Sequence, residues 1–509
     1  MEETEARRAM AVVDPSGVEG LDGLLGGGLP RGALALVVGA PGSGKTTLAV
    51  QIGFAAARAG RRVLLLTALS ESTTKLIAHL RLFDFFDEGA LGQGVQIHSL
   101  QAFLPHGLTT TAEEIRAEVR RTRATLVVLD GFRGIRGADA QAARQFLYEL
   151  STGLDALQAT TLITSEAEPR DSMLFPEVTT ADVLLGIHYR LDGMRHQRHI
   201  EAIKVRGAAP LPGLHSLTLS SAGARVAARL EARVAALEAP GDDSALPLGG
   251  RAAFGLPELD ALLDGGLTRD TPTLLLGSPG TGKTLLGLYF AVAGARAGEP
   301  TVLLGFGETL GELLHKGDTF ALGADLRAVL AEGQLTVLRY APLELDPDEL
   351  AATLLDTLDR VGARRLIVDS VGALERAVAE GTDHRRVATY LAALIEALRR
   401  RRITALLVKE TASLTSSDLE QGADTLALSA ANVVWLQQVA YRGRLHRVLS
   451  VPKMRYSAHD VALLEFTISA PEGLRMLAPF QSGSEVLAGI AGQQGMPMSQ
   501  EGDGAGPAR

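Results

Sequence analysis

Two glycine-rich segments decide the fold of this chain: Gly39-Ala40-Pro41-Gly42-Ser43-Gly44-Lys45-Thr46 and Gly277-Ser278-Pro279-Gly280-Thr281-Gly282-Lys283-Thr284. Both fit the P-loop pattern GxxxxGK[ST]. The glycines let backbone N–H groups turn toward phosphate oxygens, and the helix that follows presents its positive N-terminal end to the same anion. The lysines of such loops bridge the β- and γ-phosphates, and the final threonines ligate Mg²⁺. Both segments therefore predict a binding site for a nucleoside triphosphate with magnesium.

The two segments belong to one internal repeat. Residues 17–46 and 255–284 share a Leu-Asp pair, a Leu-Leu pair, a Gly-Gly-Leu turn, an apolar run and the glycine-rich loop. Lys283 follows Lys45 by 238 residues, and two later landmarks return after 237 and 239 residues. A near-constant offset indicates that one domain was duplicated. The alternative, a glycine-rich turn with an incidental lysine, does not explain a match that recurs in register.

An aspartate ends an apolar run in each copy, Asp130 after LVVL and Asp369 after LIV. Each follows the lysine of its own P-loop by 85 or 86 residues. A carboxylate at this place can hold the water shell of Mg²⁺ opposite the P-loop. The alternative is an ordinary aspartate in a turn, but the matching spacing favours the metal role. The sequence thus predicts Thr46, Asp130, Thr284 and Asp369 as magnesium ligands.

A Lys-x-Arg pattern recurs late in each copy. Lys204 and Arg206 lie in IKVRG, and Lys453 and Arg455 lie in VPKMRY, 249 residues further on. The longer offset places about ten extra residues in the second copy, predicted around 411–425. Alternate residues of a strand face one side of the sheet, and such cations are usually solvated. Their return in both copies favours a charged finger that reaches a neighbour's γ-phosphate, which requires an oligomer.

Other arginines carry weaker signals. The run Arg399–Arg402 suggests a nucleic-acid patch, but it also closes an amphipathic stretch, where cations offset the helix dipole. The dipole explanation is the stronger one. Arg133 and Arg136 follow Asp130 and could line a pore, although single loop arginines are more often solvated.

Short apolar runs alternate with amphipathic stretches in both copies, which predicts an α/β fold with a mainly parallel sheet, flanked by helices, in each. In the first copy strands are expected at 34–38, 63–67, 126–130 and 161–165, with an antiparallel extension at 183–189 and 199–205. The predicted organisation is a tail at 1–13, a domain at 14–226, a helix and linker at 227–252, a second domain at 253–476 and a disordered tail at 477–509.

Composition excludes several classes of protein. The 509 residues contain 50 Lys and Arg and 59 Asp and Glu, a formal charge of −9. This balance, with only 4% aromatic residues, does not suit a protein that binds nucleic acid over its surface. The absence of cysteine excludes disulfides, cysteine-ligated zinc and thiol nucleophiles. Residues 1–16 do not form a secretory signal, and no apolar run is long enough to span a membrane, so a cytoplasmic protein is expected.

The layout resembles the KaiC-type branch of RecA-like P-loop ATPases. Each half carries LD…GGL upstream of the P-loop, an aspartate at a strand end and a late Lys-x-Arg strand, and the resemblance covers roughly residues 14–475. It implies two tandem RecA-like domains that bind ATP and Mg²⁺, in a homohexameric double ring with ATP at subunit interfaces. It also assigns the role of a trans-acting finger to Lys204, Arg206, Lys453 and Arg455.

Two departures from the family pattern bear on catalysis. In RecA-like ATPases a glutamate after the second strand polarises the attacking water, and KaiC-like proteins have adjacent acids there. This chain has Leu69-Ser70-Glu71 and Phe306-Gly307-Glu308, so the first acid is missing from each pair. Glu71 and Glu308 are the predicted bases; the alternative is helix capping. The resemblance also implies a Ser-Thr phosphoacceptor pair, but the equivalent stretch, residues 426–430, offers only Ser429 as a weak candidate.

Three functions remain open at this point. The leading hypothesis is a ring-forming ATPase that acts in signalling or regulation with an unknown protein partner. The second is a nucleotide sensor, or a serine/threonine kinase acting on itself or a partner, with little hydrolysis. The third is a DNA-handling relative of RecA or RadA. RadA-like proteins carry a four-cysteine zinc module, which a chain without cysteine cannot form.

Overall fold

The structure of the chain is a computed structural model. It describes residues 12–67, 73–104, 107–132, 140–167, 169, 179–192, 194–237, 250–381, 385–411, 426, 429–441, 443–456, 459 and 462–479. The chain divides into two compact units, the first comprising Met1–Glu238 with Asp348–Ala352 and the second the remainder. We call the part from β1 to α9 the first domain and the part from β12 to β22 the second domain.

The first domain is built around a nine-stranded sheet in the order β11-β10-β9-β8-β3-β7-β6-β4-β5. The strands from β8 to β5 in this order are parallel, and β9, β10 and β11 continue the sheet antiparallel. The sheet strands are β3 (Leu34–Gly39), β4 (Val63–Thr67), β5 (Val95–Ser99), β6 (Leu126–Asp130), β7 (Thr160–Glu166), β8 (Val183–Asp192), β9 (Arg195–Val205), β10 (His215–Ser220) and β11 (Gly223–Ala227). The remaining elements are β1 (Val13–Asp14), α2 (Leu21–Leu25), β2 (Leu29–Pro30), α3 (Lys45–Arg58), α4 (Thr73–Leu80), α5 (Leu108–Thr122), α7 (Ala140–Asp155) and α9 (Leu230–Ala236).

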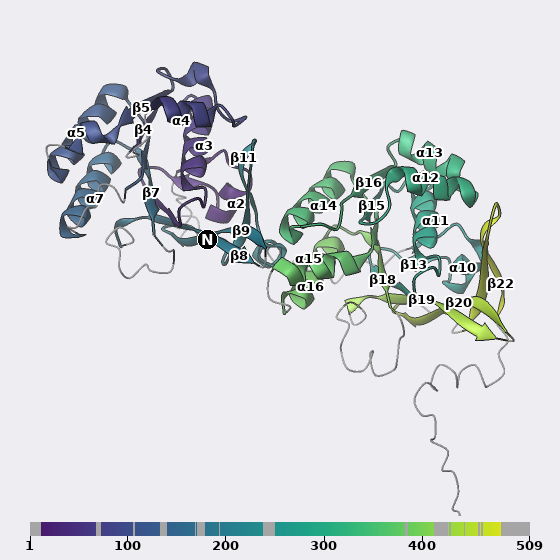
Figure 1. The fold of residues 1–509 in the computed structure, drawn as a ribbon. Helices are drawn as coiled ribbons and strands as arrows, with labels where there is room; N and C mark the ends of the chain where they lie inside the picture. Colours follow the sequence, from purple (N-terminus) through teal and green to yellow (C-terminus); the bar gives the residue numbers. More distant parts are fainter. Residues whose placement is uncertain are drawn as a thin grey trace, which may run out of the picture. The chain divides into compact units, whose positions relative to one another are not determined.

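Helices cover both faces of this sheet (Figure 1). Because strand side chains alternate between faces, Ala35 and Val37 of β3 pack with α2, α3 and α4 in one core cluster. Leu36 and Val38 pack with α5 and α7 in another. The strands are buried on both faces, which explains why β3, β4 and β6 read as continuous apolar runs.

The second domain repeats this architecture. Its sheet has the order β16-β15-β17-β18-β14-β19-β20-β21-β22. Read from β22 to β16, this order matches that of the first sheet strand for strand. The sheet strands are β14 (Pro272–Gly277), β15 (Thr301–Gly305), β16 (Leu335–Arg339), β17 (Arg365–Asp369), β18 (Thr404–Glu410), β19 (Asn432–Tyr441), β20 (Arg444–Met454), β21 (Leu464–Ser469) and β22 (Gly473–Pro479). The remaining elements are β12 (Arg251–Ala252), α10 (Pro257–Leu262), β13 (Leu267–Thr268), α11 (Lys283–Arg296), α12 (Leu310–Thr319), α13 (Gly323–Ala331), α14 (Pro347–Val361), α15 (Val371–Gly381) and α16 (Arg386–Arg400).

The structure confirms the predicted fold class, two tandem α/β domains with antiparallel extensions. Every strand predicted in the first copy is present. Strand β22 continues to Pro479 and so includes residues 477–479, the first three residues of the predicted C-terminal tail. The extra residues predicted around 411–425 lie almost entirely outside the described residues, as do most of both predicted tails.

No helix among the described residues is both long and apolar enough to cross a membrane.

The four arginines predicted to close a helix do so at the end of α16. Three of them pair with acids: Arg399 and Arg400 with Glu396, and Arg401 with Asp359. These pairs favour the structural explanation of the basic run over a nucleic-acid patch.

Candidate nucleotide sites

Each P-loop joins a buried strand to a helix in the arrangement that the sequence predicts. β3 ends at Gly39 and α3 begins at Lys45, and β14 ends at Gly277 and α11 begins at Lys283. No side chain caps the N-terminus of α3 or of α11. The first N–H groups of both helices therefore remain available to a phosphate group.

The glycine before each lysine is required by both conformation and space. Gly44 and Gly282 have φ of 102° and 98°, in the left-handed region that side chains rarely adopt. A Cβ on Gly44 would lie 2.5 Å from Leu219 Cδ1, and one on Gly282 would lie 2.4 Å from Ile468 Cδ1. The antiparallel extension of each sheet thus packs directly against the loop that it supports.

Threonine and aspartate meet beside each P-loop. The Thr46 hydroxyl donates to Asp130 at 3.0 Å, and the Thr284 hydroxyl donates to Asp369 at 2.6 Å. Asp130 also accepts a hydrogen bond of 2.5 Å from Thr164. One hydroxyl and one carboxylate suit magnesium, which commonly takes one or two protein oxygens and completes its shell with phosphate and water. The four predicted ligands therefore fit the metal, and their role stays a prediction.

Burial shifts the pKa of both aspartates upward. Asp130 is 2% exposed, and its desolvation raises the pKa more than the hydrogen bonds from Thr164 and Thr46 lower it. Desolvation likewise raises the pKa of Asp369, and the charge of Glu308 adds to the rise. Without nucleotide, hydrogen bonds and nearby lysines thus offset only part of the cost of burying the two negative charges.

This shift predicts the effect of Asp130→Asn combined with Asp369→Asn on stability. A carboxyl whose pKa is raised by folding binds its proton more tightly in the native chain. It therefore destabilises that chain above the unfolded pKa of about 3.9. Without nucleotide, the variant should melt a few degrees above wild type at pH 7, since 1 kcal/mol corresponds to about 2–4 °C. The gain should shrink toward pH 4. Calorimetry at both pH values checks this, and a lower melting temperature at pH 7 would contradict it.

Each P-loop lysine donates a hydrogen bond to a carbonyl of its own loop. Lys45 donates to the carbonyl of Ala40, and Lys283 donates to that of Ser278, each at 2.8 Å. Burial lowers the pKa of both lysines, and nearby acids oppose this shift. A bound phosphate would replace these carbonyl contacts.

The predicted base of the second domain lies in a cavity of about 260 Å³ together with Thr284 and Asp369. Glu308 forms an ion pair with Lys316, and its other oxygen is buried without a hydrogen-bond partner. Helix capping does not explain Glu308, because Thr309 and Glu312 form the capping box of α12. Glu71, the predicted base of the first domain, lies outside the described residues, as do Ser70, Arg133 and Arg136.

The Lys-x-Arg residues lie at the opposite end of each sheet from their own P-loop. The Lys204 ammonium donates to the carbonyl of Ala181, and Arg206 pairs with Asp182 at 2.9 Å. Asp182 in turn accepts from the N–H of Leu34, the first residue of β3. Strand β3 is six residues long, about 17 Å, and the P-loop follows its other end. Arg206 therefore cannot reach the nucleotide of its own domain.

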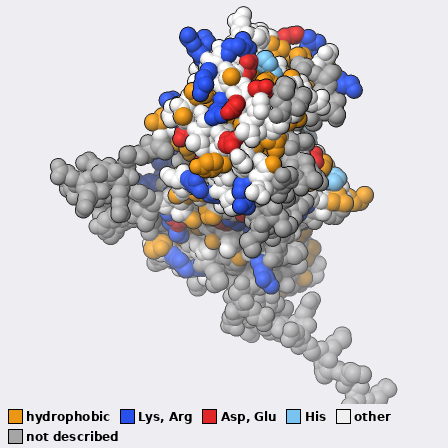
Figure 2. All heavy atoms as spheres, turned by 90° about the vertical axis from the view of Figure 1, so that its left-hand side faces the viewer, with side chains coloured by type: hydrophobic (Ala, Val, Ile, Leu, Met, Phe, Trp, Pro, Cys, Tyr) orange, Lys and Arg blue, Asp and Glu red, His pale blue; other side chains and the backbone are white. Residues whose placement is uncertain are grey.

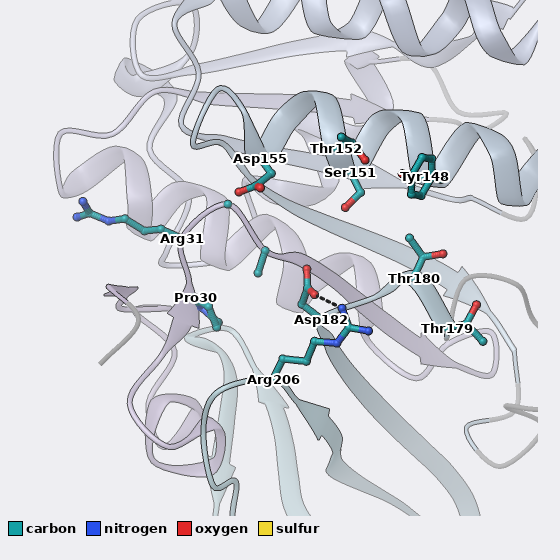
Figure 3. A pocket seen from close by; sticks show the side chains of 12 residues that line it. Pro30, Arg31, Tyr148, Ser151, Thr152, Asp155, Thr179, Thr180, Asp182 and Arg206 are labelled. Atoms are coloured by element: carbon teal, nitrogen blue, oxygen red, sulfur yellow. Dashed lines mark hydrogen bonds and ion pairs between the residues drawn. The ribbon is translucent and has the colours of Figure 1, made fainter. Parts of the chain in front are cut away.

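A cavity of about 600 Å³ opens beside Arg206 at this end of the first domain. Figure 3 shows Arg206 and Asp182 on one side of it and Tyr148, Ser151 and Thr152 of α7 on the other. In the second domain Arg455 follows β20, and its N–H bonds Ala431, which bonds the first residue of β14. Both Lys-x-Arg pairs therefore lie away from the P-loop of their own domain, and their role stays a prediction.

Four functional candidates are absent from the sequence-based prediction. Arg198 of β9 donates to the P-loop carbonyl of Gly42 at 3.4 Å, and the Nε atoms of Arg198 and Arg447 are buried without a hydrogen-bond partner. Arg376 and Glu410 line the cavity around Glu308. One signal that could have found Arg198 is its recurrence, since Arg447 follows it by 249 residues, the same offset as the Lys-x-Arg pattern.

Comparison with known proteins agrees with this geometry. A sequence profile described as the KaiC ATPase family matches residues 14–231 and again residues 252–480. The chain belongs to the KaiC family. Its two KaiC-type ATPase domains are the two domains described above.

Similarity to named relatives extends over nearly the whole chain at low identity. The circadian clock oscillator protein KaiC of Picosynechococcus sp. is 26% identical over 496 residues, which cover 93% of this chain and 91% of that protein. KaiC 1 of Synechocystis sp. is 26% identical over 93% of this chain and 90% of its own length. KaiC of Thermostichus vulcanus is 25% identical over 96% of this chain and 93% of its own length. Its membership of the KaiC family therefore makes this chain an ATPase with two ATPase domains.

Proposed function

We propose that this KaiC-like ATPase hydrolyses Mg·ATP at the interfaces of a homohexameric double ring and acts in signalling or regulation. The observation that carries the ring is the position of Arg206. Since it lies a whole strand length from its own P-loop, it can act on a nucleotide only from a neighbouring copy. Head-to-tail contacts between copies generate a ring when the rotation from one copy to the next closes. The names of the relatives support self-association only by analogy.

In this proposal each group of site residues has its own role in phosphoryl transfer. Lys45 and Lys283 orient the β- and γ-phosphates, and Thr46, Asp130, Thr284 and Asp369 hold the metal, which neutralises phosphate charge when bound. Glu308 accepts a proton from the water that attacks the γ-phosphorus, and its equivalent in the first domain is Glu71. Lys204, Arg206, Lys453 and Arg455 of neighbouring copies stabilise the charge of the transition state. ADP leaves as the bond between the γ-phosphorus and the bridging oxygen breaks.

One measurement pair tests this function. Mg·ATP should raise the mass of the assembly to about six times the 53.5 kDa of the chain. Steady phosphate release should accompany it and stop when EDTA removes the magnesium. A chain that stays monomeric with Mg·ATP, or that releases phosphate equally well in EDTA, would contradict the proposal.

A nucleotide sensor is the second candidate, favoured by the ion pair between Glu308 and Lys316 and by Gly307 in the place of an acid. A sensor would assemble on ATP without releasing phosphate. A kinase would instead place labelled γ-phosphate on protein, either on itself or on a partner.

DNA handling receives less support. On the face shown in Figure 2, basic and acidic side chains are interspersed among apolar ones. The ion pairs of one helix show the same mixing: on α5, Arg121 pairs with Glu118 and Arg116 with Glu113. Alternating charges of this kind do not form the continuous basic groove that tracks a nucleic-acid backbone.

A further inference from the structure

A glutamate ends the strand beside each P-loop strand. In the first domain Glu166 of β7 stands in register with Gly39 of β3, and in the second Glu410 of β18 stands in register with Gly277 of β14. Gly39 and Gly277 are the first residues of the two P-loops. Each glutamate therefore occupies the same position relative to its loop, one strand away from it.

In the second domain this glutamate contacts the P-loop lysine. The Glu410 carboxylate lies 3.8 Å from the Lys283 ammonium. The lysine side chain is 6% exposed, whereas the glutamate side chain is 61% exposed and lines the cavity at the phosphate end of the site. An almost buried cation is thus neutralised by a carboxylate at the mouth of the pocket.

The electrostatics of the first domain follow the same pattern. Burial lowers the pKa of Lys45, and the charge of Glu166 is the largest influence that opposes the shift, ahead of Asp130. For Lys283, burial again lowers the pKa and the charge of Glu410 leads the opposing influences, ahead of Asp369. The strand register agrees with this order, because it places each glutamate opposite the first residue of its P-loop.

The other acids around the second pocket have different partners. Glu308 pairs with Lys316, and Asp369 accepts the hydroxyl of Thr284. A nucleotide must take Lys283 onto its phosphates, so it has to displace Glu410 and then remain beside that carboxylate. Both the lost ion pair and the repulsion between carboxylate and phosphate oppose binding.

We propose that Glu166 and Glu410 are displaceable counter-ions of the P-loop lysines, which weaken the retention of nucleotide and so speed the release of ADP. The proposal rests on the proposed function only in that both P-loops must bind nucleotide. It assigns a positioning role to two residues that act through the lysines.

The test measures ADP binding to the full-length chain carrying Lys45→Ala, which leaves only the second site. Adding Glu410→Gln should tighten the binding of fluorescent Mg·ADP about five-fold, with a correspondingly slower dissociation. In 1 M salt the difference in ADP affinity between the chains with and without Glu410→Gln should approach zero, because salt screens an exposed ion pair. Glu166→Gln in a chain carrying Lys283→Ala tests the first site in the same way.

Glu375→Gln is the matched control. It removes the same charge from the same end of the sheet, where Glu375 pairs with Lys409, the residue before Glu410, at 2.8 Å. Affinity should stay within about two-fold in this control, since its partner is not the P-loop lysine. Unchanged or weaker ADP binding in Glu410→Gln would overturn the counter-ion role while leaving the proposed function intact. Equal tightening in Glu375→Gln would assign the effect to general charge and overturn it as well. Failure of the Lys45→Ala chain to bind ADP at all would overturn both proposals.

Discussion

A one-to-one mixture of two inactive variants should regain about a quarter of the wild-type rate of phosphate release. The first variant carries Lys45→Ala and Lys283→Ala, and the second carries Arg206→Ala and Arg455→Ala. Alone, the first variant loses its contacts to the phosphates. The rate of phosphate release by the second variant should fall about 10³-fold or more, the typical contribution of an arginine finger.

Recovery is expected because each complete site needs one intact P-loop and one intact neighbour. In a randomly mixed ring half of the subunits carry an intact P-loop, and half of these face a neighbour with intact arginines, so about a quarter of interfaces are complete. This expectation is drawn from the position of Arg206, which lies at the Leu34 end of β3, whereas the P-loop follows the Gly39 end.

The variants are mixed without nucleotide to allow exchange, and phosphate release is followed after Mg·ATP is added. Arg81→Ala serves as the control, because Arg81 forms an exposed ion pair with Glu88 and should leave the rate unchanged. If the arginine variant alone stays active, or if the mixture stays inactive, the trans-acting role is wrong.

The sequence predicts the parts of this molecule that depend on local patterns. The P-loops follow from glycine and lysine at fixed spacing, and the central strands follow from apolar runs that a two-faced parallel sheet requires. Asp130 and Asp369 also lie where the repeat places them, each beside its threonine. The edge strand β5 is different, because only Val95 of its five residues is buried and its sequence lacks a continuous apolar run.

Functional residues that act through strand order could not be predicted in this way. Glu410 reaches Lys283 only because β18 lies between β17 and β14, and strand order is a non-local property that no short motif encodes. A single acid at a strand end is also an unremarkable pattern. The signal was available in the repeat, since the runs LITSE and LLVKE both end in glutamate and lie 244 residues apart. Comparing the two copies residue by residue, rather than motif by motif, would have found it.

The second large effect concerns the buried ion pair between Arg365 and Glu299 in the second domain. Arg365, at the start of β17, is among the largest fully buried side chains, and its Nε donates to Glu299 at 2.5 Å. Its guanidinium also donates to the carbonyl of Ala253 and lies 4.4 Å from the ring centre of Phe290. Gly294 makes room for it, because a Cβ there would lie 2.4 Å from the Arg365 Cδ. In the first domain the equivalent strand begins with Leu126.

Glu299→Ala should therefore destabilise the second domain by about 3–5 kcal/mol, because it leaves a buried guanidinium without its counter-charge. At about 2–4 °C for each kcal/mol, the melting transition of that domain should fall by roughly 6–20 °C, and that of the first domain should not move. Differential scanning calorimetry of the nucleotide-free chain checks this. Asp318→Asn is the control, since its pair with Arg327 is exposed and should contribute less than about 1 kcal/mol.

A double variant separates the buried charge from the packing around it. Glu299→Leu with Arg365→Leu removes both charges and copies the leucine of the first domain, so it should be more stable than Glu299→Ala, even though it loses the hydrogen bond to Ala253. Replacing both partners of a buried pair by apolar residues is often neutral or stabilising, whereas removing one partner is not. If the double variant melts lower than Glu299→Ala, the packing and hydrogen bonds of Arg365 stabilise this strand more than neutralisation of its charge does, and the ion-pair explanation is wrong.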